Sequence, residues 1–340
     1  MGISAGATPR TVLVTGGAGF IGSNIAARLA ARPDMEVVVC DRLREASLGK
    51  WRNLNAVPLM DLIHPDDLAA FLAKAGRSIA AVVHMGAVSS TTEPDADKIV
   101  AANIGLSKRI WGWCVEQQKP LIYASSAATY GDGEQGFVDA NDLTAIAALS
   151  PLNAYGWSKK AFDVMALKQA ARGSAPPRWG GLRFFNVYGP NERHKGGQKS
   201  VVAHIYPQIR AGAAVKLFKS HNPAYEDGKQ LRDFIFVQDC VDVIEWLLEG
   251  ERHAGLLNVG TGQARSFLDL AHATFTAAGK KPKIEFVDTP EAIRANYQYF
   301  TQADMTRLRE LGYERQFTPL EAGVAAYVSE SLRPDADRGI

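Results

Sequence analysis

A buried strand that runs directly into a glycine-rich turn constrains the fold of this chain more than any other feature. Residues 11–15, TVLVT, are apolar and β-branched, which suits a strand buried on both faces of a parallel sheet. Gly16 permits a tight turn, Gly19 lets the backbone approach a pyrophosphate, and Gly22 lets the following helix pack close to the strand. The stretch therefore predicts a dinucleotide site in which the phosphates meet the positive end of a helix.

A second apolar strand, residues 36–40, ends at Asp41 and favours this interpretation over a glycine turn that binds no ligand. Asp41 suits the free ribose hydroxyls of NAD, whereas the adjacent Arg42 could pair with the 2′-phosphate of NADP. These two neighbours leave the choice of cofactor open.

Strand and helix patterns alternate along the chain to about residue 190. We expect strands at residues 79–84 and 120–124, and helices at residues 64–75, 97–117 and 150–172. This alternation predicts an α/β fold built on a Rossmann-type, doubly wound parallel sheet.

The alternation ends after residue 190. Residues 190–228 mix glycine, proline and basic residues around one amphipathic helix at 201–211, and strands at 233–237 and 256–259 are expected to return to the main body. The expected parts are a disordered start (1–10), a dinucleotide-binding domain (11–190) that also receives segments near 233–260, a smaller mixed α/β substrate lobe (191–330), and a tail (331–340).

Composition argues against several other classes of protein. The net charge of the 340 residues is +2 and the basic residues are scattered, so we expect no nucleic-acid or membrane partner. Cys40, Cys114 and Cys240 lack CxxC spacing and predict neither a disulfide framework nor a metal site. No stretch approaches the ~18 apolar residues of a membrane span, and the first ten residues lack a signal-peptide core. We expect a soluble, cytoplasmic protein.

The residues best suited to chemistry follow the ends of predicted strands or lie on the helix at 150–172. Tyr155 and Lys159 stand about one helical turn apart on the same face. A lysine charge, together with a nicotinamide cation, would lower the pKa of the phenol toward the working range, so that Tyr155 could exchange a proton with a substrate hydroxyl during hydride transfer. Ser126, at the end of the strand 120–124, could bind the same hydroxyl. A surface pair is the alternative for an isolated YxxxK.

The glycine motif, this serine and YxxxK together resemble the extended short-chain dehydrogenase/reductase superfamily, which includes nucleotide-sugar epimerases and dehydratases. Within it, the chain is similar to the ADP-heptose 6-epimerase branch from about residue 11 to residue 328. The stretches that carry this resemblance are SSTTE (89–93), YASSAATYGDG (123–133), PLNAYGWSK (151–159), NVYGPNERHKGG (186–197), LRDFIFVQD (231–239), LNVGTGQARSF (257–267) and YQYFTQADM (297–305). The HKG that follows NVYGP is the most discriminating of these.

That resemblance implies an isomerase of lipopolysaccharide core heptose synthesis. It would oxidise carbon 6 of ADP-glycero-manno-heptose to an aldehyde with bound NADP and return the hydride to the other face. The resemblance assigns the two acid/base roles to Tyr155 and Lys195. Lys195 needs a lowered pKa for this role, from burial or from the adjacent charges of Arg193 and His194, and a phosphate contact is its alternative role. The resemblance further implies a homo-oligomer, such as a pentamer.

The candidate site residues form two sets. The expected cofactor site consists of Gly16, Gly19, Phe20, Ile21, Gly22, Asp41, Arg42, Lys50, Met85, Gly86, Ala87, Ser89, Asn103, Tyr155, Lys159, Val187 and Lys195. The expected substrate site consists of Ser126, Asn186, Gly197, His204, Phe218, Arg232 and Tyr297. Within these sets, Arg232 suits a bidentate grip on the diphosphate, whereas His204 and Phe218 could be structural instead. The resemblance favours NADP, with NAD as the alternative.

Two departures from the branch and two other functions stay open. Gly197 stands where a serine is expected, and the insert 220–231 is longer than expected, so positions there do not transfer. Another nucleotide-sugar 4-epimerase or 4,6-dehydratase is the first alternative function, although a dehydratase would carry an Asp-Glu pair where this chain has Ala127 and Ala128. A non-catalytic dinucleotide-binding protein is the second, and the intact serine, tyrosine and lysine argue against it.

Overall fold

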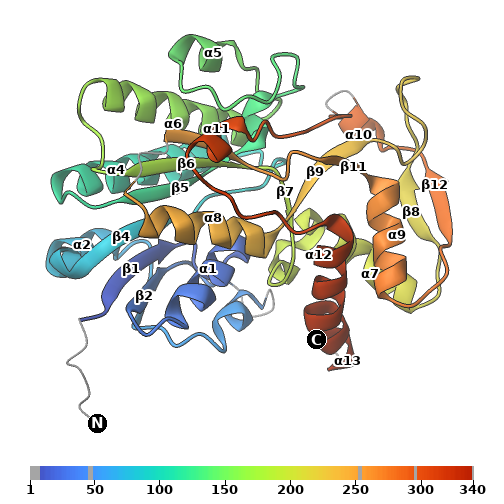
Figure 1. The fold of residues 1–340 in the computed structure, drawn as a ribbon, viewed down its shortest axis with the longest axis horizontal. Coiled ribbons are helices and arrows are strands. Elements are labelled where there is room, and N and C mark those ends of the chain that lie inside the picture. The colour runs from blue at the N-terminus through green and yellow to red at the C-terminus, as the bar shows by residue number, and fades with distance from the viewer. Residues whose placement is uncertain (1–7, 45–48, 252–254, 295–296, 339–340) are drawn as a thin grey trace.

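The computed structural model describes residues 8–44, 49–251, 255–294 and 297–338. A large parallel sheet with helices on both faces forms one side of the molecule, and a lobe of smaller sheets and helices forms the other (Figure 1). The predicted doubly wound α/β fold with a smaller mixed lobe is confirmed. The expected disordered start lies mostly outside the described residues, because residues 1–7 are not among them and the first strand begins at Arg10.

Seven strands pair in parallel in the main sheet, in the spatial order β10-β6-β5-β4-β1-β2-β3. Their bounds are β1 (Arg10–Thr15), β2 (Met35–Cys40), β3 (Asp61–Ile63), β4 (Ile79–His84), β5 (Leu121–Ser126), β6 (Trp179–Phe184) and β10 (Gly255–Val259). The chain order reverses at β1, between β2 and β4. Ligands of open α/β sheets bind at such a switch point, beyond the carboxyl ends of the strands.

Two apolar cores cover the faces of this sheet. Val12 and Val14 of β1 point into the first core, against α1 (Phe20–Ala30) and α8 (Val237–Glu249). Leu13 lies between them and points into the second, which holds α2 (Leu68–Ala75), α4 (Leu106–Glu116) and α6 (Ala154–Ala171). Successive strand residues face opposite sides, so a strand covered by helices on both sides must be apolar throughout.

The lobe contains two small sheets. In the first, β9 (Leu231–Phe236) lies between β7 (Asn186–Tyr188) and β11 (Ala264–Ser266). In the second, β8 (Val215–Phe218) pairs with β12 (Ile284–Val287). Only one of the two strands expected to return to the main sheet does so. β10 joins it, whereas the strand predicted at 233–237 is β9 and stays in the lobe, because β7 and β11 supply its partners.

The remaining helices surround these sheets. They are α3 (Ala96–Ile99), α5 (Leu143–Ala148), α7 (Val201–Arg210), α9 (Phe267–Ala277), α10 (Glu291–Arg294), α11 (Thr306–Glu310), α12 (Leu320–Tyr327) and α13 (Arg333–Asp337). A π-helical turn, Val328–Leu332, joins α12 to α13, so most of the expected tail is helical. Short 3-10 helices span Lys50–Leu54, Gly76–Ser78, Ala127–Tyr130 and Arg193–Gln198.

Local chemistry explains where the predicted helices begin and break. The helix expected at 150–172 starts at Ala154, because the side chain of Asn153 caps it by accepting the Gly156 N–H at 2.8 Å. The helix expected at 97–117 is interrupted by a π-helical turn, Val100–Gly105, which places the amide of Asn103 toward the sheet. The segment 42–58, expected to be irregular, contains the 3-10 helix Lys50–Leu54.

Among the described residues, no helix combines the length and the apolar character needed to cross a membrane. The same residues contain no group of three or more His, Cys, Asp or Glu side chains that could hold a metal ion. All three cysteines are buried and unpaired with one another.

Candidate active site

A cavity of about 1010 Å³ opens at the carboxyl ends of the central strands and continues under the loop after β7. Most of the predicted site residues line it, although they come from distant parts of the sequence. Those lining it are Gly16, Gly19, Phe20, Ile21, Gly22, Asp41, Lys50, Met85, Gly86, Ala87, Ser89, Ser126, Tyr155, Lys159, Val187, Lys195 and Gly197. The fold therefore brings the glycine turn, YxxxK and HKG to one place.

The glycine turn has a backbone that side chains could not follow. Gly16 has φ +68°, and a Cβ there would lie 2.6 Å from the backbone nitrogen of Gly86. A Cβ on Gly22 would lie 2.2 Å from the carbonyl oxygen of Gly16. Gly19 is the N-cap of α1 and brings no capping side chain, so the N-terminus of the helix faces the cavity with its backbone groups. This cradle fits a diphosphate.

Asp41 lies at the end of the cavity beside the glycine turn. Its carboxylate accepts the N–H of Ala18 at 2.8 Å and the ammonium of Lys50 at 2.6 Å. Arg42 points elsewhere: it is exposed and pairs with Asp66 at 2.5 Å. Lys50, which binds Asp41, and Arg44 are both cationic residues that line the cavity.

The YxxxK pair stands on α6 beside Ser126. Lys159 donates to the carbonyl of Ala124 at 2.8 Å, and its Nζ lies 5.9 Å from the centre of the Tyr155 ring. Burial lowers the pKa of Lys159 to about 8, although the charge of Asp163 opposes this shift. The expected lowering of the Tyr155 pKa is not found. Burial raises it, and a hydrogen bond with Ser126, rather than the charge of Lys159, is the opposing influence.

A chain of buried polar side chains, most of it not predicted from the sequence, ties the glycine turn to the region behind the cavity. Thr15 Oγ1 lies 2.5 Å from Nδ1 of His84, whose Nε2 lies 2.9 Å from the hydroxyl of Ser107. Ser107 in turn donates to the carbonyl of Asn103 at 2.6 Å. Burial lowers the pKa of His84 to about 3, so the imidazole is neutral. It therefore carries one N–H, which it can donate to one of its two neighbours in this chain. The available signal in the sequence was that these polar residues stand within otherwise apolar segments.

Asn103 extends that chain to α6. Its amide accepts the N–H of Val88 at 2.8 Å and donates to the Val88 carbonyl and the Ser158 hydroxyl, both at 3.0 Å. Ser158 donates to the carbonyl of Tyr155 at 2.7 Å. Asn103 is 1% exposed and lies behind the cavity wall, so its observed contacts support the loop after β4 and the helix α6.

Lys195 approaches the cavity from the loop after β7. It lies in the 3-10 helix Arg193–Gln198, and its Nζ is 5.1 Å from the centre of the Phe20 ring. Burial lowers the pKa of Lys195, and the charge of Glu192 opposes that shift. The expected contribution of positive neighbours is not found. The pKa of His194 is itself lowered to about 4, chiefly by burial, and Arg193 is exposed and lies 3.7 Å from Asp335.

Glu192 is a site residue that was not predicted from the sequence. Its side chain is fully buried and accepts both the hydroxyl and the backbone N–H of Ser200, each at 2.5 Å. Ser200 also caps α7. Burial raises the pKa of Glu192. This carboxylate joins the loop that carries Lys195 to the lobe.

The other predicted substrate residues lie away from the wall of this cavity. Asn186 is exposed, with its Oδ1 3.4 Å from the hydroxyl of Thr301. His204 is exposed, with Nε2 3.1 Å from the carbonyl of Gly197. Phe218 is 37% exposed, which argues against the alternative that it is a core residue.

Arg232 and Tyr297 contact each other in the lobe. The guanidinium of Arg232 is 5.6 Å from the centre of the Tyr297 ring and donates to the carbonyls of Leu231, at 2.8 Å, and Gln298. Arg232 is only 8% exposed and is not among the residues that line the cavity, so its expected grip on a diphosphate stays a prediction. Two positions were expected to depart from the ADP-heptose 6-epimerase branch. The insert 220–231 contacts Tyr299 instead of the cavity. A Cβ on Gly197 would meet no atom within 4 Å, so packing does not exclude a serine at this position.

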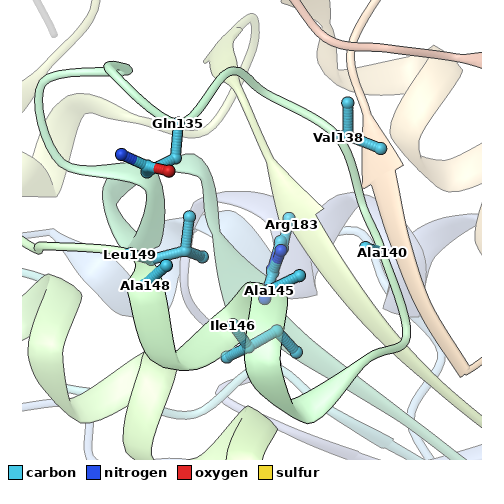
Figure 2. A pocket seen from close by; sticks show the side chains of 8 residues that line it. All are labelled: Gln135, Val138, Ala140, Ala145, Ile146, Ala148, Leu149 and Arg183. Carbon is cyan, nitrogen blue, oxygen red and sulfur yellow. The ribbon is translucent and has the colours of Figure 1, made fainter.

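A second cavity, of about 120 Å³, lies between α5 and the segment 135–140 (Figure 2). Its wall is largely apolar, with Arg183 at its base. The side chain of Arg183 is fully buried and donates to Asp163 at 3.0 Å and to the Tyr130 hydroxyl at 3.1 Å, while its Nη2 has no hydrogen-bond partner among the described residues. This cavity does not compete with the larger one as a candidate active site.

Comparisons with known proteins agree with this geometry. The model of the NAD dependent epimerase/dehydratase family matches residues 12–260. A curated protein of Fusobacterium nucleatum subsp. nucleatum named ADP-L-glycero-D-manno-heptose-6-epimerase is 44% identical over 329 residues, which cover 94% of this chain and 98% of that protein.

Two solved structures show the same fold. The ADP-L-glycero-D-manno-heptose-6-epimerase of Helicobacter pylori superposes with a TM-score of 0.77 at 29% identity and covers 95% of this chain and 96% of its own. The UDP-glucose 4-epimerase of Thermus thermophilus, solved in complex with NAD, superposes with a TM-score of 0.72 at 26% identity and covers 94% of this chain and 97% of its own.

Proposed function

The chain belongs to the NAD dependent epimerase/dehydratase family, and we propose that it is an isomerase that interconverts the two carbon 6 epimers of ADP-glycero-β-D-manno-heptose. One observation carries this proposal: Tyr155 of α6 and Lys195 of the loop after β7 line the same cavity. An epimerisation by oxidation and reduction requires proton transfer on both faces of one carbon, and two titratable groups from separate elements can provide it. The product would feed lipopolysaccharide core synthesis in the cytoplasm, and the enzyme would act as a homo-oligomer.

The cavity fits a nicotinamide dinucleotide. Gly16, Gly19 and Gly22 would hold the diphosphate at the N-terminus of α1, and Asp41 and Lys50 would hold the adenosine ribose. When bound, this cofactor supplies a hydride acceptor that becomes a hydride donor. NADP is the proposed form, because the ammonium of Lys50 beside Asp41 offers a partner for a 2′-phosphate.

Tyr155 serves the first face of carbon 6. Since burial raises its pKa, the phenol is protonated at neutral pH and can donate a hydrogen bond to the substrate oxygen, with Ser126 as the second donor. The hydrogen bond from Ser126, which lowers the Tyr155 pKa, stabilises the phenolate that forms when Tyr155 gives up its proton, and Lys159, whose pKa is about 8, is charged at neutral pH and lies near the ring. The same phenolate can accept a proton from the alcohol in the opposite direction.

Lys195 serves the second face. Its ammonium lies beside the Phe20 ring in a partly buried position, and burial lowers its pKa, which makes a neutral amine accessible at lower pH than for an exposed lysine. The amine can take the proton of the epimeric hydroxyl, and the ammonium can return it. In this proposal the aldehyde turns between the two groups without a covalent step.

Incubation with ADP-D-glycero-β-D-manno-heptose tests the proposal. Chromatographic separation of the carbon 6 epimers should show an equilibrium mixture with no net consumption of NADP. Retention of the starting epimer by enzyme saturated with cofactor, together with turnover of a UDP-sugar at carbon 4, would assign the chain to another nucleotide-sugar enzyme of the family.

A further inference from the structure

The 3-10 helix Lys50–Leu54 lies between the adenosine end of the cavity and the loop that carries Lys195. Residues three apart in a 3-10 helix lie on the same face. Lys50 and Asn53 therefore share one face of this helix, and Leu54 anchors it by burial in the apolar core beneath α1. A displacement of Lys50 along this face moves Asn53 as well.

The amide of Asn53 joins three separate segments. It donates to the carbonyl of Ala18 in the glycine turn at 2.9 Å and to the carbonyl of Asn191 at 3.0 Å. It also lies 3.2 Å from Nδ1 of His194. Since the two amide hydrogens of Asn53 are donated to the two carbonyls, His194 is a close neighbour of this amide, and the His194 ring also hydrogen-bonds the backbone of Asn191.

Ala18 is held from both sides. Its N–H donates to Asp41, which also binds Lys50, and its carbonyl accepts from Asn53. Ala18 and Asn53 thus connect two sets of contacts. One set surrounds the adenosine ribose site, and the other holds the loop at residues 191–195.

The start of this loop is attached to α1 as well. Asn191 has a φ of +75° and donates to the hydroxyl of Ser23 at 3.0 Å, and Asn24 donates to the carbonyl of Pro190 at 3.0 Å. Those contacts fix residues 190 and 191. Asn53 bonds the carbonyl of Asn191 and contacts the ring of His194, next to Lys195, from this side.

We propose that Asn53 is a positioning residue that couples occupancy of the adenosine ribose site at Asp41 and Lys50 to the placement of the Lys195 loop. This inference rests on the proposed function for the role of Lys195, but the coupling itself concerns the protein alone. Its consequence is that the cofactor bound at one end of the cavity sets the geometry of the acid/base group at the other end.

Hydrogen exchange of the peptide spanning residues 190–199 tests the coupling without relying on activity. Adenosine 2′,5′-bisphosphate is the probe, because it can occupy the adenosine end without reaching Lys195, and 5′-AMP is used in a second arm. Calorimetry confirms that each probe is bound. In the wild type, a saturating probe should slow exchange in this peptide about tenfold, comparable to the gain of one or two hydrogen bonds. Asn53→Leu should remove this protection while retaining probe binding.

Arg52→Ala is the matched control. Arg52 lies on the same 3-10 helix but is exposed and contacts the Trp51 ring, so its variant should keep the protection. Equal protection in Asn53→Leu and the wild type, or no protection in the wild type with the probe bound, would overturn the proposal.

Kinetics give a second, independent result. Asn53→Leu should slow epimerisation about tenfold more than it slows the first reduction of bound cofactor by substrate, measured by the absorbance of the reduced nicotinamide. The rising limb of the pH profile should move to higher pH, because a released Lys195 is less buried. Asn53→Leu combined with Lys195→Met should add no further loss to Lys195→Met alone, and additive losses would contradict a role through Lys195. If the wild type does not epimerise ADP-heptose, the proposed function fails, while the exchange experiment still decides the coupling.

Discussion

Burial lowers the pKa of both lysines of the cavity, but the two lysines are held by very different structures. Lys159 stands on an 18-residue helix packed against the main sheet, whereas Lys195 stands on a short 3-10 helix that contains Gly196 at φ +57°. Each has a carboxylate that opposes the fall of its pKa, Asp163 for Lys159 and Glu192 for Lys195.

Their carboxylates differ in the same way. Asp163 is bound by Tyr123, Ser125 and Arg183, all on strands of the main sheet. Glu192 is bound by Ser200 at the start of α7, in the lobe. We call the side of the cavity that carries Tyr155 and Lys159 the Tyr155 wall, and the side formed by the loop with Lys195 the Lys195 wall. The Tyr155 wall is therefore a product of the dinucleotide-binding fold, whereas the Lys195 wall depends on how the lobe packs against that fold.

Removal of the phenol should give the largest effect on activity. Tyr155→Phe is expected to reduce turnover at least ~100-fold, because it abolishes general acid–base assistance on the first face. Cofactor binding should stay nearly unchanged, as measured by titration of the purified variant. Wild-type turnover with cofactor bound would show that Tyr155 is not the acid/base group.

Removal of the Lys195 amine should distinguish the role of Lys195 from that of Tyr155. Lys195→Met is expected to reduce epimerisation about 100-fold while reduction of bound cofactor by substrate changes much less, since Tyr155 still serves its own face. A nucleotide sugar with an aldehyde at carbon 6 gives the decisive measurement, the stereochemistry of the alcohol formed by each variant. If Lys195→Met and Tyr155→Phe both give the wild-type ratio of epimers, Lys195 is a phosphate ligand and not a base.

Lys50→Met tests the adenosine end, which both walls share. It is expected to weaken NADP about tenfold more than NAD, as for the loss of one charge-assisted contact to a 2′-phosphate. Arg42→Ala, the matched control, should change the preference by less than about twofold, because Arg42 is exposed and paired with Asp66. An equal loss of both dinucleotides in Lys50→Met would show that Lys50 does not bind the 2′-phosphate.

The smallest expected effect concerns the link between the Lys195 wall and the lobe. Glu192→Gln removes the charge that raises the pKa of Lys195, so this pKa should fall further. The neutral amine would then form at lower pH, and the rising limb of the kcat/KM profile for epimerisation should move to lower pH, with a change of about threefold at neutral pH. Glu249→Gln, at an exposed ion pair with Arg32, is the control. A shift to higher pH would mean that loss of loop structure outweighs the charge.

The dinucleotide-binding half could be predicted because its signals are local. The strand TVLVT, the glycine turn and the one-turn spacing of Tyr155 and Lys159 each follow from backbone sterics or helical geometry over a few residues. The carboxyl ends of parallel strands meet at one edge, so their site residues converge whatever the loops do. For the same reason, Ser126 and Gly86 lie where the sequence places them, on the wall of one cavity.

Lys195 could be assigned only by resemblance, since no local rule predicts where a short loop points. The sequence did not indicate a role for Asn53 or Glu192. Asn53 lies in a polar stretch typical of the surface, and Glu192 lies in the charged segment NERHK, which is typical of a solvated loop. The expected substrate residues Arg232 and Asn186 are motif positions that are not among the residues lining the cavity, and their role in substrate binding stays a prediction.

Sequence alone thus determined the parallel sheet, the nucleotide cradle and the Tyr155 wall, because hydrophobic periodicity and glycine geometry act over short distances along the chain. Tertiary structure decided which charges are buried and hence the direction of each pKa. It placed Lys195 beside Phe20, which is far away in the sequence, and Glu192 beneath the lobe. Desolvation depends on every atom packed around a group, and those atoms come together only in the folded protein, where the lobe packs against the main sheet.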